Sequence, residues 1–452
     1  MTSLLYIAGI LIFVVSILVS IGLHELGHMI PAKAFGGKVT QYFIGFGPTV
    51  WSRRRGETEY GVKAIPLGGY VKIVGMLPPG AEQLGTVEYD DQGNQVTRIR
   101  KSNTGIFTQL ISDARAAEWE LITPADDERL FYKMAWWKKV VVMAGGPSVN
   151  IAIAFFLFWT VFATYGNPTD DAVDSGAPVI SSVNKCVIPA SEQRTACEAG
   201  DQLSPAFEAG LRPGDTITSF NGTAITSYDQ LQELIRANKD GRAEIGYERD
   251  GTAYTTTTST LLQDRPVDTD HPDQLESVGF LGVAPTTHRV TGGPLYTLVQ
   301  MGYTAEQTVE AMVRLPERVW GVAKAIVGVQ DRDPESPVSI VGGSRIAGET
   351  ASATWLPNDA KITFLLLLVA GFNFFIGAFN FIPLLPLDGG HIASALWEAV
   401  RRGLAKLRGL PDPGFVDAAK LLPIAYVMAS AMLVMSLVLI VGDLVVPIHI
   451  TG

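Results

Sequence analysis

The stretch His24-Glu25-Leu26-Gly27-His28 comes directly after an uncharged run over residues 1–23. On a helix, His24 and His28 share one face, where two imidazole nitrogens can bind one Zn²⁺ ion. Glu25 lies beside them and can act as the general base of a metalloprotease. Because the uncharged run is long enough to span a bilayer, the pattern predicts a transmembrane helix over residues 1–31 that carries a zinc-dependent hydrolytic site at membrane depth.

Three further uncharged stretches, over 140–165, 362–387 and 421–442, are each long enough to cross a membrane. With 47% hydrophobic residues, the 452-residue chain is too apolar for a purely soluble protein. The start of the chain has no basic region, and no A-x-A-like site precedes His24, which favours a retained first span over a cleaved signal peptide. The sequence therefore predicts a polytopic α-helical membrane protein with four transmembrane helices.

Lysine and arginine near the ends of spans determine their orientation, and here these residues are unevenly distributed. They are frequent in the loop after the first span and in the short loop before the fourth, whereas none lies over 166–184 or after residue 442. We therefore expect the first and third loops in the cytoplasm and both termini and the long second loop outside. The net charge of −10 resides mainly in this outer loop, which argues against a nucleic-acid partner.

The two cysteines, Cys186 and Cys197, both fall in the loop expected outside the cytoplasm. A disulfide that closes a small loop is the natural interpretation in an oxidising compartment. Metal binding is the weaker alternative, because no histidine or further cysteine lies near them in the sequence.

After the histidine motif, residues 36–76 contain short alternating runs of Val, Ile, Tyr and Phe interrupted by Gly and Pro, which predict β-hairpins. A sheet held near the metal helix could offer an open edge to an extended substrate peptide near Gly68 and Tyr70. Taken alone, the pattern slightly favours an ordinary cytoplasmic β-meander. Residues 77–132 are polar and acidic and predict a cytoplasmic insertion with one short helix near 116–121.

The outer loop contains a β-rich unit over 177–286. Its core sequence over 204–222 (SPAFEAGLRPGDTITSFNG), followed by an amphipathic helix pattern over 228–238, closely resembles the PDZ domain of bacterial proteases. PDZ domains bind peptides by adding a strand to a sheet edge beside a helix. The cysteine pair lies at the entry to this unit, where it could alter or block the groove. Residues 292–361 predict an extracytoplasmic amphipathic region that lies on the membrane or packs over the spans.

A catalytic zinc requires three protein ligands and one open position. Asp388 stands at the end of the third apolar segment, 362–391, where a carboxylate is costly unless it is compensated. Zinc held by the two histidines would compensate it, which makes Asp388 the candidate third ligand. Pro383 and Pro386 break the helix in front of it and free backbone groups that must line a polar cavity.

Other polar residues in the spans have competing interpretations. Asn373 and Asn380 are seven residues apart on one helix face and could bind the substrate backbone or the oxyanion. His391 is better explained as a polar cap than as a fourth ligand, because catalytic zinc keeps one position open. Asn150 is most simply explained as a hydrogen bond between helices.

These motifs together resemble the site-2 protease family of intramembrane zinc metalloproteases, of the bacterial regulator-of-sigma-factor type. The resemblance rests on His24-Glu25-x-x-His28, on Leu387-Asp388-Gly389, and on one PDZ unit between them, with further similarity at 66–72 (PLGGYVK) and 146–150 (GPSVN). It implies that His24, His28 and Asp388 bind Zn²⁺ and that Glu25 is the base. It also implies that residues 36–76 form a membrane re-entrant sheet that clamps the unwound substrate. The acidic insertion and the single PDZ unit, where some relatives carry two, depart from the pattern.

We therefore expect an intramembrane endopeptidase that cleaves the transmembrane segment of single-pass membrane proteins, plausibly a pre-trimmed anti-sigma factor, with membrane lipid as its surroundings. The PDZ unit would exclude untrimmed substrates. The main alternative is a non-catalytic membrane PDZ adaptor, which predicts degraded metal motifs. A metal-ion transporter would need a chain of polar residues across several spans, whereas only the second and third carry asparagines.

Overall fold

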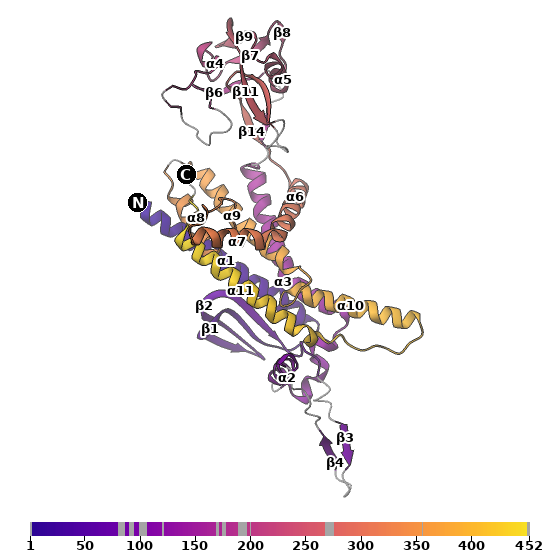
Figure 1. Cartoon of the computed structure of the whole chain (residues 1–452). Coiled ribbons are helices and arrows are strands. Elements are labelled where there is room, and N and C mark those ends of the chain that lie inside the picture. The colour runs from indigo at the N-terminus through magenta and orange to yellow at the C-terminus, as the bar shows by residue number, and fades with distance from the viewer. Residues whose placement is uncertain are drawn as a thin grey trace. The chain divides into compact units, whose positions relative to one another are not determined.

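The computed structural model divides the chain into two compact units (Figure 1). Residues 1–163 and 293–452 form the membrane unit, and residues 164–292 form the PDZ-like unit. The structure describes residues 2–79, 86–89, 95–98, 106–119, 122–168, 171–173, 178–188, 197–198, 200–266, 275–354 and 356–449.

Four helices of the membrane unit are long and apolar enough to cross a bilayer, which confirms the predicted four-span fold. They are α1 (Thr2–Ala34), α3 (Trp136–Thr164), α9 (Asn358–Asn380) and α11 (Leu422–Val445). The third element ends earlier than the predicted 362–391, because α9 stops at Asn380 ahead of the two prolines. Asp388 is instead the first residue of a separate helix, α10 (Asp388–Leu407).

The predicted region 292–361 consists of three helices, α6 (Pro294–Val313), α7 (Leu315–Ile326) and α8 (Ile340–Ser352). Helix α8 packs along α1 around a core of Phe13, Ile17 and Ala347. Gly9 permits this close approach, because a Cβ at that position would lie 2.8 Å from the Cβ of Ala351.

Strands β1 (Val39–Arg55) and β2 (Thr58–Ile73) form an antiparallel sheet. Both strands are long, and part of each one pairs with two different segments of the other. Residues 39–44 pair with 69–73 on one side and with 59–62 on the other, and residues 49–55 pair with 58–63. The segment 69–73 thus has one strand partner among the described residues, which leaves its other edge open.

Part of the predicted insertion over 77–132 falls outside the described residues. The described part contains β3 (Thr86–Tyr89) paired with β4 (Gln95–Arg98), the helix α2 (Ile106–Trp119), and two short 3₁₀ helices, Pro124–Arg129 and Phe131–Lys133. The helix expected near 116–121 starts earlier and is longer than predicted. Arg115 of α2 binds Asp417 at 2.6 Å, next to the 3₁₀ turn Ala418–Leu421 that precedes α11.

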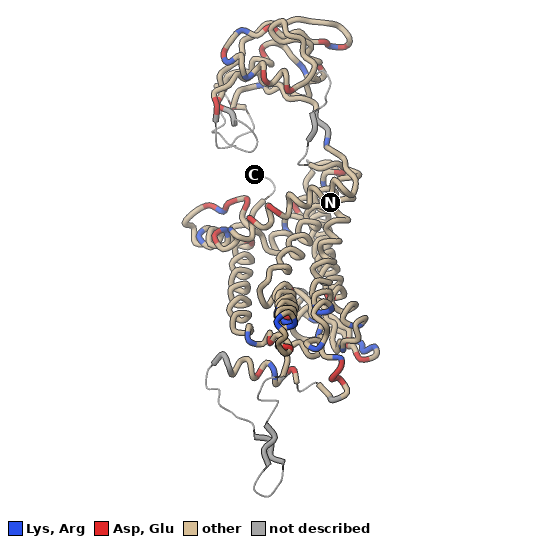
Figure 2. Tube along the Cα trace, turned by 90° about the vertical axis from the view of Figure 1, so that its right-hand side faces the viewer, with Lys and Arg blue, Asp and Glu red and all other residues tan. Residues whose placement is uncertain are grey.

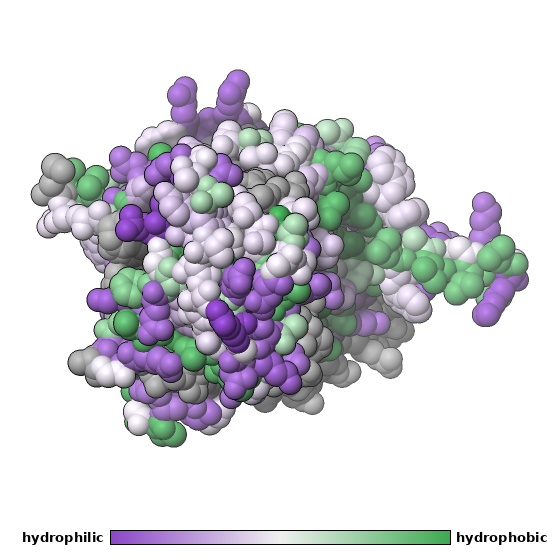
Figure 3. Space-filling view, turned by 90° about the horizontal axis from the view of Figure 1, so that it is seen from above, coloured by the Kyte–Doolittle hydropathy of each residue, from purple (hydrophilic) through white to green (hydrophobic). Residues whose placement is uncertain are grey.

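The amphipathic helix α10 leaves the bundle across the direction of the spans (Figure 1). One side of α10 is fixed to the start of α3 by an ion pair of 2.8 Å between Lys139 Nζ and Glu398 Oε2, whose side chains are 7% and 2% exposed. The Val416 N–H also donates to this carboxylate, at 3.2 Å. The opposite side is apolar and exposed (Figure 3); its residues are Leu396, Trp397, Val400, Leu404 and Leu407.

The PDZ-like unit has a four-stranded sheet in the order β10-β9-β7-β8. Helix α5 covers a core that includes Ile217, Phe220, Leu231 and Ile245. Arg249 donates to the buried Asp215 at 2.7 Å. Burial by itself would raise the Asp215 pKa, but the hydrogen bonds from Arg249 and from the Arg212 N–H, together with the positive charges of both arginines, outweigh it, so the pKa is lowered. The elements of this unit are β5 (Asp171–Val173), β6 (Ile180–Val183), α4 (Pro205–Glu208), β7 (Thr216–Phe220), β8 (Thr223–Ala224), α5 (Tyr228–Asn238), β9 (Arg242–Arg249), β10 (Thr252–Ser259), β11 (Leu261–Pro266), β12 (Leu275–Phe280), β13 (Val283–Pro285) and β14 (Thr287–Arg289).

The sulfurs of Cys186 and Cys197 are bonded in this unit, with their Cα atoms 5.9 Å apart. Cys186 also forms an isolated β-bridge with Leu203, immediately before the short helix α4. The disulfide joins the described ends of the segment between these cysteines, and the β-bridge to Leu203 connects them to the rest of the PDZ-like unit.

Replacing Glu398 by Leu is expected to lower the free energy of unfolding by about 3–5 kcal/mol, because it leaves the Lys139 ammonium buried without its partner. The double variant Lys139→Met, Glu398→Leu should recover most of that loss. Denaturant unfolding in mild detergent, followed by tryptophan fluorescence, measures both. Glu57→Gln is the matched control, since the Glu57–Arg129 pair is more than a third exposed on each side and its loss should cost about 0–1 kcal/mol. Equal losses for the single and double variants would contradict the explanation.

Candidate metal centre and its cavity

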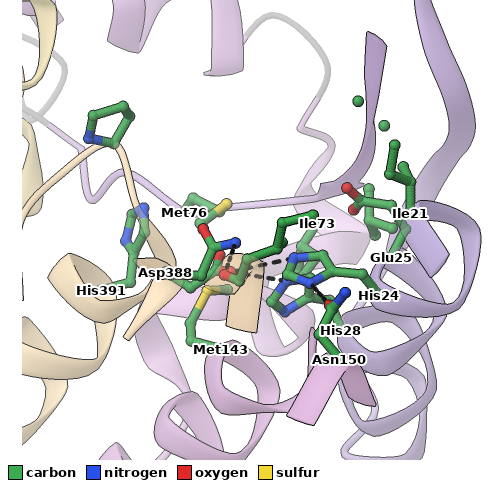
Figure 4. A pocket seen from close by; sticks show the side chains of 16 residues that line it. Ile21, His24, Glu25, His28, Ile73, Met76, Met143, Asn150, Asp388 and His391 are labelled. Atoms are coloured by element: carbon green, nitrogen blue, oxygen red, sulfur yellow. Dashed lines mark hydrogen bonds and ion pairs between the residues drawn. The ribbon is translucent and has the colours of Figure 1, made fainter. Parts of the chain in front are cut away.

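Three side chains from two helices meet at one point in the membrane unit (Figure 4). His24 and His28 lie one turn apart on α1, and their Nε2 atoms are 3.2 Å from each other. Asp388, at the start of α10, places Oδ2 at 3.4 Å from His24 Nε2 and at 3.3 Å from His28 Nε2. The structure thus brings together the three residues that the sequence proposes as metal ligands.

The remaining nitrogen of each histidine is held by α3. His24 Nδ1 lies 2.6 Å from Asn150 Oδ1, and His28 Nδ1 lies 2.8 Å from the Val142 carbonyl oxygen. Both partners are acceptors, so each Nδ1 donates a proton and each Nε2 keeps its lone pair free. Such partners are typical of metal-binding histidines, because they set the tautomer and the orientation of the ring.

This donor set fits a zinc ion. Tetrahedral zinc with ligands at about 2.0–2.1 Å requires its donor atoms to be about 3.3 Å apart, and the three separations here are 3.2–3.4 Å. Two imidazoles and one carboxylate are a common catalytic set that leaves a fourth position open. His391 lines the adjoining cavity but is not part of this cluster.

Small residues let α3 approach the histidines closely. A Cβ at Gly146 would lie 2.8 Å from His24 Nε2 and even closer to the His28 ring. A Cβ at Gly27 would lie 2.5 Å from the Gly145 carbonyl oxygen, so α1 and α3 touch through their backbones at this point. A larger side chain at Gly146 would therefore displace the ligands.

A cavity of about 420 Å³ adjoins the three ligands, and Glu25 lines it. The strand segment that begins at Gly69 passes directly beside Glu25, because a Cβ at Gly69 would lie 2.9 Å from Glu25 Cγ. The other lining residues are Ile21, Gly68, Val71, Ile73, Met76, Met143, Asn150, Ile376, Asn380, Pro386 and His391.

The four residues proposed to bind substrate do not share one position. Gly68 and Asn380 line the cavity. Asn373 is completely buried and does not; its Oδ1 accepts a hydrogen bond of 3.1 Å from Asn150. Tyr70 lies on the face of the sheet away from Gly69 and Val71, where its ring stacks on Phe43. The structure therefore places Gly68 and Asn380, but not the side chains of Asn373 and Tyr70, at the cavity, and substrate contact at all four positions stays a prediction.

Asn150 has a larger part than the interhelical bond that the sequence suggests. Its Oδ1 orients His24, and its amide Nδ2 donates to Asn373, so the two asparagines form a chain that ends on a metal ligand. The signal in the sequence is a polar residue inside an uncharged span. The partner was not predictable, because it comes from a different helix.

Helix α2 of the insertion reaches the rim of this cavity. The Glu118 carboxylate accepts hydrogen bonds from the N–H groups of Met76 and Leu77, and Met76 lines the cavity. Burial raises the pKa of Glu118 above its usual range, although these two hydrogen bonds favour the charged form and oppose that shift. The insertion thus supports the residues that directly follow β2, one of which lines the cavity.

Comparisons with known proteins identify the family of this chain. The sequence profile of Peptidase family M50 matches residues 12–410. Zinc metalloprotease Rip1 of Mycobacterium tuberculosis is 33% identical over 99% of this chain and 100% of its own length, and Metalloprotease MmpA of Caulobacter vibrioides is 24% identical over 87% and 86%. A solved PDZ domain of an SdrC-like protein from Listeria monocytogenes matches 25% of this chain and 92% of its own, with 16% identity and a TM-score of 0.16. The chain belongs to peptidase family M50, the site-2 protease family of zinc metalloproteases that its motifs predict.

Proposed function

We propose that this chain is a zinc-dependent intramembrane endopeptidase that cleaves the transmembrane segment of single-pass membrane proteins. The observation that carries the proposal is the cluster of His24, His28 and Asp388, with Glu25 in the adjoining cavity, inside a unit built around four membrane-spanning helices. Charged groups at such a depth are costly and usually functional. A hydrolytic site explains each of them.

When bound, zinc would acidify a water molecule and polarise the scissile carbonyl group. Glu25 lines the same cavity, where its carboxylate can take the proton of the attacking water and pass it to the leaving amine. Asn380 can help to hold the substrate backbone. One amide N–H of Asn380 donates to the Ile376 carbonyl at 3.1 Å, and no partner is found for its second N–H in the described part of the chain.

The open edge of residues 69–73 supports binding of the substrate as an added strand. Every second residue of this segment, namely Gly69, Val71 and Ile73, faces the cavity. A peptide paired along this edge would therefore pass beside Glu25 and the proposed metal ligands. A transmembrane helix shields its own peptide bonds. The substrate helix must therefore unwind locally before it can pair with this edge.

The substrate in this proposal is a single-pass membrane protein that another protease has already trimmed, such as an anti-sigma factor, and the PDZ-like unit excludes untrimmed forms. The basic residues support an orientation with the termini and the PDZ-like unit outside and the active site towards the cytoplasm. Lys and Arg gather at the end of the bundle where α3 and α11 begin (Figure 2).

A non-catalytic PDZ adaptor would not need three convergent ligands and a neighbouring carboxylate.

The first test separates metal binding from proton transfer. Glu25→Gln is nearly isosteric but cannot accept the water's proton, so it should reduce cleavage by about 10²- to 10⁴-fold and leave the zinc content unchanged. His24→Ala and Asp388→Ala should lower zinc content and cleavage together. Metal analysis beside a cleavage assay on purified variants measures both quantities.

Glu306→Gln, the same chemical change at an exposed position of α6, is the control and should match the wild type. A Glu25→Gln protein that cuts at the wild-type rate would rule out the proposed mechanism. Full zinc content in Asp388→Ala would remove the third ligand.

The second test concerns unwinding of the substrate. Replacing a Gly within the substrate's span by Leu should slow cleavage by about four- to fivefold per position, because it stabilises the helix by about 0.8–1 kcal/mol. A Leu→Ala replacement at a neighbouring position is the control, since these residues have similar helix propensity. The rates are measured on reconstituted substrates. If the cleavage rate does not depend on helix-breaking residues in the substrate, binding as an added strand is contradicted.

The third test concerns orientation. Fusions of a periplasm-active and a cytoplasm-active reporter at Gly200, in the PDZ-like unit, and at Gly409, after α10, should report opposite sides of the membrane. Activity on the same side at both positions would overturn the proposed topology.

A further inference from the structure

A second cavity, of about 650 Å³, lies between α10, the start of α11 and the segment that leads into Asp388. It shares no lining residue with the metal cavity. Residues 383–385 and Gly390 form part of its wall, whereas Pro386, Asp388 and His391 line the metal cavity. The two cavities therefore lie on either side of one short stretch of chain that carries the third ligand.

One part of the wall of this second cavity is apolar. Leu384 and Leu385 come from the segment before Asp388, Trp397 from α10, and Leu421 and Ile424 from the start of α11. The volume is within the range of pockets that hold small ligands. Such a wall suits hydrocarbon chains.

Another part of the wall carries unbalanced positive charge. Arg401 and Lys420 both line the cavity. Within the described residues, Arg401 donates to the Pro413 carbonyl at 2.9 Å and no acceptor is found for Lys420 Nζ. Asp417 also lines the cavity, but it is already paired with Arg115 at 2.6 Å. The two cations are therefore available to an anionic group from outside.

The position of α10 matches the surface of a bilayer. The Lys139–Glu398 pair holds α10 at the level of the first turn of α3, where Trp136 and Trp137 are exposed. Aromatic residues beside basic ones at the end of a span mark the membrane–water interface. The exposed apolar face of α10 extends away from the bundle at this level, as an interfacial helix does (Figure 3).

We propose that this second cavity is a binding site for an anionic phospholipid of the adjoining leaflet. The headgroup binds Arg401 and Lys420, and the acyl chains lie along Leu384, Leu385 and Ile424. A phospholipid supplies the negative charge and the hydrocarbon that this wall requires, at the depth where α10 lies. Because the bound lipid packs against 383–385 and Gly390, it steadies the segment that positions Asp388.

The direct test measures lipid retention and does not depend on proteolysis. The full chain, purified in mild detergent with added phosphatidylglycerol and phosphatidylcholine, is examined by native mass spectrometry. The wild type should retain phosphatidylglycerol in preference to phosphatidylcholine. Arg401→Gln, Lys420→Gln should lose this preference by roughly tenfold or more. The conservative pair Arg401→Lys, Lys420→Arg should keep it, which distinguishes lost charge from misfolding.

Lys406→Gln is the matched control, because Lys406 is an exposed cation on α10 that lines neither cavity. It should leave retention unchanged. Inorganic phosphate at millimolar concentration should not displace the lipid; displacement by phosphate would show a simple anion site and overturn the proposal. Equal retention by the wild type and the double Gln variant would overturn it as well. So would a photo-crosslinker at Ser394 that captures a second copy of the chain in place of lipid.

A second readout rests on the proposed protease function. In vesicles that contain phosphatidylglycerol, cleavage by Arg401→Gln, Lys420→Gln should fall while the Lys406→Gln control stays at the wild-type rate. In pure phosphatidylcholine the double variant and the wild type should cleave equally. If lipid retention behaves as expected but no cleavage is seen with any variant, the lipid site stands and the proposed function fails.

Discussion

The arrangement of the proposed metal ligands, and of the cavity beside them, depends on the contact between α1 and α3. Two imidazole rings from α1 take their orientation from groups on α3, the Asn150 side chain and the Val142 carbonyl. Glycines at the crossing allow the two backbones to meet there. Polar groups at this depth must find partners within the protein, because lipid offers none. A change in the α1–α3 distance would therefore disturb the ligands and their partners together.

The proposed metal ligands and the proposed base could be picked out from the sequence because their chemistry is contained in short motifs. His24, Glu25 and His28 are adjacent on one helix, and Asp388 is an acid at the end of an apolar segment next to two prolines. The four spans, too, follow from hydropathy alone, since an uncharged run of this length has few other uses.

The features that could not be predicted depend on which residues of other helices and strands pack against a side chain. Helical spacing places Asn373 and Asn380 on one face of α9, but it does not say that Asn373 meets Asn150 while Asn380 meets the cavity. In the same way, alternation along β2 is visible in the sequence, yet which face is turned to Glu25 depends on how the sheet packs on α1. The sequence therefore does not show that the Tyr70 side chain stacks on Phe43, on the face away from the cavity. Residues of β1 and β2 pair with two segments of the other strand, with several register shifts between the pairs. Local strand propensity does not show these shifts.

The origin of the ligands has a consequence for biosynthesis. His24 and His28 belong to α1, whereas Asp388 comes after the third of the four described spans. An incomplete chain, even one with its first two spans inserted, carries two ligands and the base but lacks the third ligand. A complete set of three ligands therefore forms only after the third span has been made and α10 lies beside α1. The order of synthesis itself delays proteolytic activity until the surrounding helices are in place to restrict which peptides can reach it.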